Sequence, residues 1–120
     1  MFKALRRVSE EREGNLLMIK DQWGINKIEI YPTVKTVCPI GKDFVNHKFK
    51  IEMVPAEKIP DYIELDLWID ENMSGKLLTA EEAVALMFIH IEKRYEPEHL
   101  IVTSETESFT HSKVIVSKWK

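Results

Sequence analysis

The sequence predicts a single α+β domain, residues 1–120, in which an antiparallel four-stranded sheet packs against one helix. Residues 47–55 and 61–69 alternate between apolar and polar side chains, which is typical of half-buried strands. A long apolar segment with a helix-start signal follows at 80–95. Two β-rich segments, 99–105 and 112–119, finish the chain. A chain of 120 residues can bury one hydrophobic core, and this order gives a β-β-α-β-β pattern.

The N-terminal part predicts an additional hairpin in front of this pattern. Residues 1–14 are polar and charged and are interpreted as a loose arm. The segments NLLMIKD (15–21) and NKIEIYPTV (26–34) flank QWGI, where Gly24 can supply a turn. We therefore expect these two segments to pair with each other.

The first two sheet strands are predicted from period-two alternation. The inward positions would be Phe49, Ile51 and Met53 in the first strand and Ile63, Leu65, Leu67 and Ile69 in the second. Because only PAEKIP (55–60) separates them, we expect an antiparallel pair. In this arrangement Glu64 lies on the polar face of a strand, and Trp68 faces outward as a possible subunit contact.

The helix has a defined start. Thr79 offers an N-cap and Glu82 follows three residues later, which is the spacing of a capping box. The helix should run from 80 to 95 and end before Pro97. It is apolar almost all round, so we expect it to be buried on two sides, by its own sheet and by a neighbouring subunit.

Charge argues against direct binding to nucleic acid. The chain carries 17 basic and 20 acidic residues, for a net charge of −3. The two signs are interspersed, and no basic stripe gives the electrostatic footprint of a nucleic-acid contact.

The sequence also predicts a soluble, cytoplasmic protein. Its single cysteine cannot form an internal disulfide, which indicates a reducing compartment. The first charged stretch lacks the apolar centre of a signal peptide. The longest apolar run, 83–89, is too short to span a bilayer.

That cysteine, Cys38, stands between Val37 and Pro39 at the start of a polar loop. A lone cysteine can be a small buried hydrophobe or an exposed nucleophile, and both interpretations are open at this point. One cysteine and scattered histidines give no metal-binding motif, and the sequence has no glycine-rich phosphate loop.

The segment 36–55, TVCPIGKDFVNHKFKIEMVP, resembles the nucleophile segment of the tunnelling-fold enzymes of 7-deazaguanine metabolism. These are the nitrile reductases of queuosine biosynthesis (the QueF family) and the QueF-like amidinotransferases of archaeosine biosynthesis, both serving tRNA modification. A Thr two residues before Cys-Pro, a loop, and a strand ending in Val-Pro match the family's order and spacing. The resemblance continues through IELDLWI and YEPEHLIV and covers about residues 36–118.

This resemblance implies that Cys38 is the nucleophile. In the family the thiolate adds to the nitrile carbon of 7-cyano-7-deazaguanine and forms a covalent thioimide, which is then converted to an amidine or reduced. A thiolate is the strongest side-chain nucleophile near neutral pH, and the nitrile carbon is an electrophile. Lys35 and Lys42 would supply positive potential that favours the thiolate.

The sequence departs from the family at three places, one of which is the helix start LTAEEAV (78–84), where the reductases have a His-Glu-containing sequence. The family has an aspartate seven residues after the cysteine, which protonates the nitrile nitrogen, and here that position is Val45. Asp43 and His47 lie nearby and are candidates for this role. The reductases carry a lysine-containing motif linked to NADPH binding, and DYIELDLW at 61–68 lacks those lysines. The resemblance therefore favours amidine formation over NADPH-dependent reduction, and it implies no other cofactor.

Carboxylates are the expected ligands of the substrate's ring edge. Tunnelling-fold proteins hold a purine- or pterin-like edge with Glu or Gln, whose oxygens match paired N–H and amino donors. The candidate holders are Asp61, Glu64, Glu81 and Glu82. We favour Glu81 and Glu64, and a solvated carboxylate is the alternative for each.

The resemblance also implies assembly. Four strands and one helix cannot close a barrel, and tunnelling-fold proteins close one by joining sheets edge to edge in a homo-oligomer with sites between subunits. A different interpretation is a non-catalytic tunnelling-fold protein that binds a purine or pterin or serves a structural role, and Val45 favours it. An unrelated α+β interaction module with an inert thiol is a third hypothesis.

Overall fold

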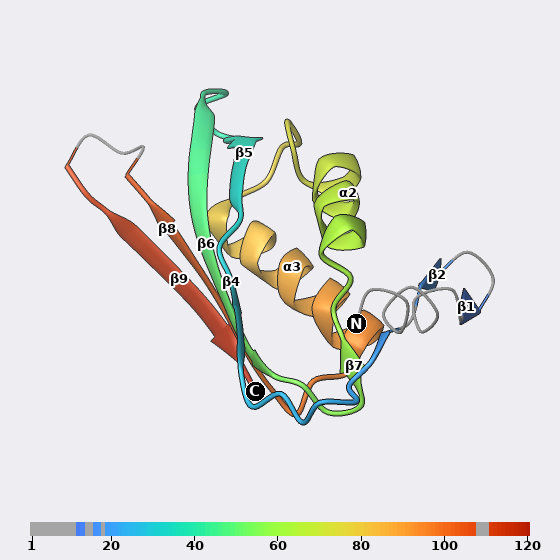
Figure 1. Ribbon diagram of the computed structural model, residues 1–120. Coiled ribbons are helices and arrows are strands. Elements are labelled where there is room, and N and C mark those ends of the chain that lie inside the picture. Colours follow the sequence, from blue (N-terminus) through green and yellow to red (C-terminus); the bar gives the residue numbers. More distant parts are fainter. Residues whose placement is uncertain (1–11, 14–15, 18, 108–110) are drawn as a thin grey trace.

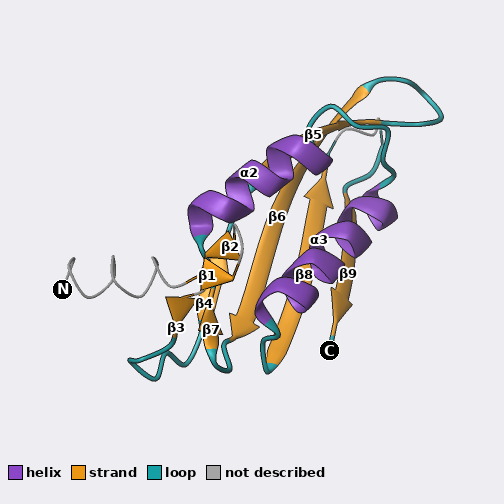
Figure 2. Cartoon of the chain, turned by 90° about the vertical axis from the view of Figure 1, so that its right-hand side faces the viewer, coloured by secondary structure: helices purple, strands orange, loops and turns teal. Residues whose placement is uncertain are grey.

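A computed structural model describes residues 12–13, 16–17, 19–107 and 111–120 of the chain (Figure 1). One antiparallel sheet forms a layer, and two helices lie across the same face of it (Figure 2). The elements in chain order are β1 (Arg12–Glu13), β2 (Leu16–Leu17), β3 (Ile19–Lys20), β4 (Ile28–Ile30), β5 (Thr33–Val37), β6 (Phe44–Val54), β7 (Lys58–Ile59), α2 (Tyr62–Asn72), α3 (Ala80–Tyr95), β8 (His99–Thr106) and β9 (Val114–Trp119).

Strand β6, at 11 residues, is the centre of the sheet. The order is β4-β6-β8-β9, and β5 also pairs with β6, so β4 and β5 occupy the same edge one after the other. Pro32 lies at the break between them, and its carbonyl accepts the Phe49 N–H at 2.8 Å. All of these pairings are antiparallel, so the predicted antiparallel sheet is confirmed, but it has five strands rather than the four predicted.

The strand predicted for 61–69 is wrong, because these residues begin helix α2. Asp61 is the N-cap, and its Oδ1 accepts the N–H groups of Ile63 at 3.0 Å and Glu64 at 3.1 Å. The helix buries Leu65 and Ile69, which lie one helical turn apart. The core order is therefore β-β-α-α-β-β, with one helix more than predicted and the first strand position filled by β4 and β5.

The predicted N-terminal hairpin is also wrong. Ile19–Lys20 (β3) pairs with β7, and Ile28–Ile30 (β4) pairs with β6, so the two segments do not pair with each other. Most of the predicted loose arm lies outside the described residues. Its last strand residues, Arg12–Glu13, pair with Leu16–Leu17.

Helix α3 begins and ends where the sequence predicts. The Thr79 Oγ1 accepts the Glu82 N–H at 3.1 Å, and a Glu82 carboxylate oxygen accepts the Thr79 N–H at 3.1 Å, which completes the capping box. One face of the helix packs against the sheet, whereas Ile89 is 46% exposed on the opposite side. The buried residues of α3 are Ala83, Val84, Met87, Phe88, Ile91 and Tyr95.

The sheet face beneath the helices changes character along its length. At the end that β4 borders it is apolar, with Ile51, Met53, Leu100 and Val102 at most 2% exposed. At the end that carries the β5–β6 loop it is partly polar, and these buried polar residues are Thr36, His47, Ser104 and Thr106. No helix in the described part of the chain is long and apolar enough to cross a membrane.

Candidate functional site

Cys38 lies on the loop between β5 and β6, directly after the last residue of β5. The loop is closed by two backbone hydrogen bonds, from the Cys38 N–H to the Asp43 carbonyl at 2.9 Å and from the Lys42 N–H to the Cys38 carbonyl at 2.9 Å. The Gly41 N–H donates to the Cys38 Sγ at 3.4 Å. The thiol is half-buried, so it is not enclosed in the aliphatic core.

The segment before α3 is attached to the same strand end. The Val37 N–H donates to the Lys76 carbonyl at 2.8 Å, and the Leu78 N–H donates to the Val37 carbonyl at 3.0 Å. This short parallel contact places Thr79, the N-cap of α3, opposite the Cys38 loop. The position of Cys38 relative to the start of α3 is therefore fixed by backbone hydrogen bonds rather than by side chains alone.

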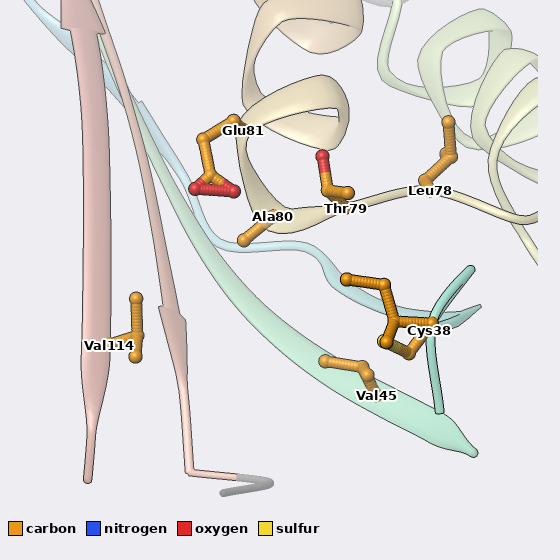
Figure 3. Close-up of a pocket in the computed structure, with 8 residues that line it drawn as sticks. Cys38, Val45, Leu78, Thr79, Ala80, Glu81 and Val114 are labelled. Carbon is orange, nitrogen blue, oxygen red and sulfur yellow. The ribbon is translucent and has the colours of Figure 1, made fainter. Parts of the chain in front are cut away.

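A pocket of about 290 Å³ lies between these two segments. Its lining residues are Cys38, Ile40, Val45, Leu78, Thr79, Ala80, Glu81 and Val114. Figure 3 shows Cys38 and Val45 across the pocket from the first turn of α3, which carries Glu81, with Val114 on a third side. Within this lining, Cys38 and Glu81 are the ionisable residues and the remaining side chains are mostly apolar. An apolar pocket with a few polar groups suits a small molecule.

Asp43 and His47, the two candidates for the acid, do not line the pocket. Asp43 is exposed on the Cys38 loop. The strand predicted to begin at His47 begins at Phe44 instead, and His47 faces the helices with 0% exposure. Its Nε2 lies 2.7 Å from Thr36 Oγ1 and its Nδ1 lies 3.0 Å from Ser104 Oγ. Burial lowers the pKa of His47, so its ring is neutral at pH 7.

The two carboxylates at the start of α3 have different surroundings. Glu81 lines the pocket, and its role as a ligand of a ring edge stays a prediction. Glu82 is occupied by the capping box, where its carboxylate accepts the Thr79 N–H. Its position at the third helical residue explains this, since a carboxylate there reaches back to the N-cap.

Asp61 and Glu64 lie far from Cys38 within one chain. Asp61 caps α2, and Glu64 accepts the Tyr95 hydroxyl at 2.5 Å and lies 3.4 Å from the His90 Nε2. Tyr95 is the last residue of α3, which at 1.5 Å per residue is about 21 Å along the helix from its first turn. The structure therefore brings Cys38 and Glu81 together in one chain and leaves Asp61 and Glu64 at the other end of the helix layer.

Sequence reasoning missed the residues that support or complete the pocket. Thr36, Ser104 and Thr106 form the polar surroundings of His47, and Val114 supplies a wall of the pocket. A signal existed in the period-two pattern, because continuing the parity of Phe49 backwards along β6 puts His47 on the buried face. Among the described residues no group of three or more His, Cys, Asp or Glu side chains is placed to hold a metal ion.

Comparison with known proteins identifies the fold. No protein-family model matches the sequence, and no curated protein matches it either. Among solved structures, the apo form of the archaeosine synthase QueF-Like superposes with a TM-score of 0.74 at 18% sequence identity. The chain has the QueF-Like fold. The match covers 80% of this chain and 94% of the QueF-Like chain, so it extends over nearly all of that enzyme. The predicted resemblance is thereby confirmed at the level of the fold.

Proposed function

We propose that this chain acts in 7-deazaguanine chemistry, with Cys38 attacking the nitrile carbon of 7-cyano-7-deazaguanine. One observation carries the proposal. In a chain with the fold of an archaeosine synthase, the single cysteine lies on a small apolar pocket and is not enclosed in the core. A half-buried thiol that accepts a backbone N–H from Gly41 at 3.4 Å is in a suitable environment for a nucleophile.

The proposed reaction has two steps. The thiolate of Cys38 forms an S–C bond with the nitrile carbon, one π bond of the nitrile breaks, and the nitrogen takes up a proton to give a neutral thioimide. Ammonia then adds to the same carbon and the Cys38 thiol leaves, which yields an amidine and restores the enzyme. This route consumes no NADPH, in keeping with the missing lysines at 61–68.

Two carboxylates have roles in this proposal. Glu81 would accept hydrogen bonds from the ring N–H and the amino group of the base, because it is the carboxylate that lines the pocket. Asp43, on the same loop as Cys38, would supply the proton to the nitrile nitrogen after a rearrangement of its exposed side chain. Asp61 and Glu64 would reach a substrate only from a neighbouring subunit.

The proposal includes a homo-oligomer. Strands β4 and β9 are at the edges of the sheet, where unpaired backbone groups can pair with another chain. Large apolar side chains are exposed on β9, with Ile115 at 58% and Trp119 at 68%. Size-exclusion chromatography with light scattering tests this part, and a stable monomer of 14.1 kDa would contradict it.

Intact-mass spectrometry tests the chemistry. The protein is incubated with 7-cyano-7-deazaguanine, and we expect a covalent adduct equal in mass to one molecule of the base. The Cys38→Ala variant should form none, and Glu81→Gln should form it at a higher half-saturating concentration. Addition of ammonia should release an amidine, whereas release only by NADPH would assign reduction instead. A wild-type protein without adduct would exclude the proposed reaction.

A second candidate is a non-catalytic protein that binds a purine or pterin in the same pocket. Val45 favours it, because an apolar side chain that is 7% exposed lines the pocket where the resembling enzymes have their acid. This candidate predicts that the base raises the melting temperature of Cys38→Ala as much as that of the wild type. Stabilisation lost in Cys38→Ala would favour the enzyme.

A further inference from the structure

The buried polar residues of the sheet are gathered beside the Cys38 pocket and are absent from the opposite end of the described core. Thr36 pairs across the β5–β6 ladder with Val45, which lines the pocket. Thr106 pairs across the β8–β9 ladder with Val114, which lines another side. His47 lies on β6 between these two positions. A polar group of four residues, Thr36, His47, Ser104 and Thr106, therefore lies on the sheet beside the pocket.

His47 joins three strands through side-chain hydrogen bonds. Its Nε2 contacts the Thr36 hydroxyl on β5 at 2.7 Å, and its Nδ1 contacts the Ser104 hydroxyl on β8 at 3.0 Å. All three residues are 0% exposed. A neutral imidazole donates from one nitrogen and accepts at the other, so one hydroxyl donates to the ring and the other accepts from it. Both ring nitrogens are therefore satisfied without a charge in the core.

Burying these four polar side chains costs free energy that an apolar core would not cost. Burying hydroxyls and an imidazole loses their hydration, and apolar side chains of similar shape fill the same sheet face a few residues away. The Thr106 Oγ1 is buried without a hydrogen-bond partner among the described residues, which adds to the cost. The benefit of the polar group is a defined geometry. Hydrogen bonds restrict the positions of side chains and strands more narrowly than apolar contacts do.

We infer that His47 is a positioning residue that, through Thr36 and Ser104, holds the strand end carrying Cys38 in the orientation needed for attack. This inference rests on the proposed function. Thr36 precedes Cys38 by two residues, and the intervening Val37 carries the backbone bonds that hold the start of α3. A bond that fixes Thr36 therefore fixes both walls of the pocket. A misplacement of about 1 Å at a reacting group can reduce a rate by about a hundredfold.

Kinetics of adduct formation with 7-cyano-7-deazaguanine test the inference. We expect Thr36→Val to lower the maximal rate of adduct formation by about tenfold to a hundredfold and to leave the half-saturating concentration unchanged. Thr36→Ser keeps the hydroxyl and should restore the rate. Ser104→Ala provides a second, smaller perturbation in case Thr36→Val folds poorly. Alkylation by iodoacetamide, which needs no oriented complex, should remain within about twofold in every folded variant.

Thr103→Val is the matched control. Thr103 also makes a cross-strand hydroxyl bond, to Ser117 at 3.0 Å, but Thr103 is half-buried and Ser117 is exposed, and neither residue contacts His47 through a hydrogen bond. Its adduct kinetics should equal those of the wild type. If Thr36→Val and Ser104→Ala match Thr103→Val, the positioning role is wrong although the proposed function stands. If the wild type forms no adduct, the proposed function is wrong, and the positioning role, which rests on it, is wrong too.

The nitrogen NMR signals of the histidine rings give an independent readout that needs no substrate. We expect the His47 ring to be neutral at pH 7, with one protonated and one accepting nitrogen, because burial lowers its pKa. Thr36→Val should shift the Nε2 signal, and Thr103→Val should leave both signals in place. A His47 ring that titrates near its unperturbed pKa of about 6.5 in the folded wild type would overturn the inference.

Discussion

Replacing Tyr95 by Phe tests the contact that joins α2 to α3. Tyr95 is 2% exposed, and its hydroxyl donates to a Glu64 carboxylate oxygen at 2.5 Å and accepts the Asp61 N–H at 3.3 Å. Phe fills the same space, so the loss is confined to these hydrogen bonds. A hydrogen bond to a charged group contributes about 1.5–3 kcal/mol. Because the Glu64 side chain is 22% exposed and can regain water, we expect a loss of about 2 kcal/mol.

The expected change in melting temperature follows from the length of the chain. At about 2.1 cal/mol/K of unfolding entropy per residue, 120 residues give about 250 cal/mol/K. A loss of about 2 kcal/mol then lowers Tm by about 8 °C. Thermal unfolding followed by circular dichroism at pH 7 measures it.

The same residue makes stability depend on alkaline pH. Burial raises the pKa of Tyr95, and the hydrogen bond to Glu64 raises it further. The unfolded chain loses this proton near pH 10 and the folded chain retains it, so the contribution of Tyr95 is complete below about pH 10 and declines above it. Tyr95→Phe should remove this decline, which amounts to about 1.4 kcal/mol per pH unit for one group.

Tyr62→Phe is the control, because it deletes the same hydroxyl from a side chain that is 51% exposed on α2. It should change the free energy of unfolding by no more than about 0.5 kcal/mol at pH 7. If Tyr95→Phe behaves like Tyr62→Phe, the hydroxyl contact between the helices does not exist in solution and the reasoning is refuted.

Three further predictions concern stability. Thr79→Ala removes the hydroxyl that caps the Glu82 N–H and should cost about 1 kcal/mol in urea denaturation, with no change counting against the cap. Met87→Ala empties a 0% exposed core position and should cost about 2–5 kcal/mol, so that a loss below about 1 kcal/mol would contradict the packing. Burial lowers the pKa of His47 and His90, so the unfolded chain binds protons more readily below about pH 6.5. Stability should therefore fall as the pH is lowered from 7 to 5, and an unchanged urea midpoint would count against neutral buried rings.

The sequence predicted the elements whose signals are local. The capping box of Thr79 and Glu82 located α3, and alternation located most of β6. The α2 helix was missed because apolar residues at every second position in 63–69 also satisfy helical spacing, with Leu65 and Ile69 four residues apart. Asp61, which caps the first turn, is the local signal that distinguishes a helix from a strand here.

The pairing of strands that are distant in sequence was the second feature that the sequence did not predict. Segment 26–34 reads correctly as extended, but its partner is the central strand β6 rather than its neighbour in sequence. For the site, Cys38 and Glu81 were both candidates from sequence, yet nothing local indicates that they share a pocket. That follows from the backbone contacts of Val37 with Lys76 and Leu78, which no pattern in a single sequence contains.

The attachment of the α3 start to Val37 has a consequence for loop engineering. Since the two hydrogen bonds lie at the end of β5, before Cys38, the stretch 39–42 makes none of the bonds that hold the helix start in place. Other four-residue sequences can therefore be substituted at 39–42 to change which ligands reach the Cys38 sulfur. The start of α3 should keep its position, because its hydrogen bonds to Val37 are not altered.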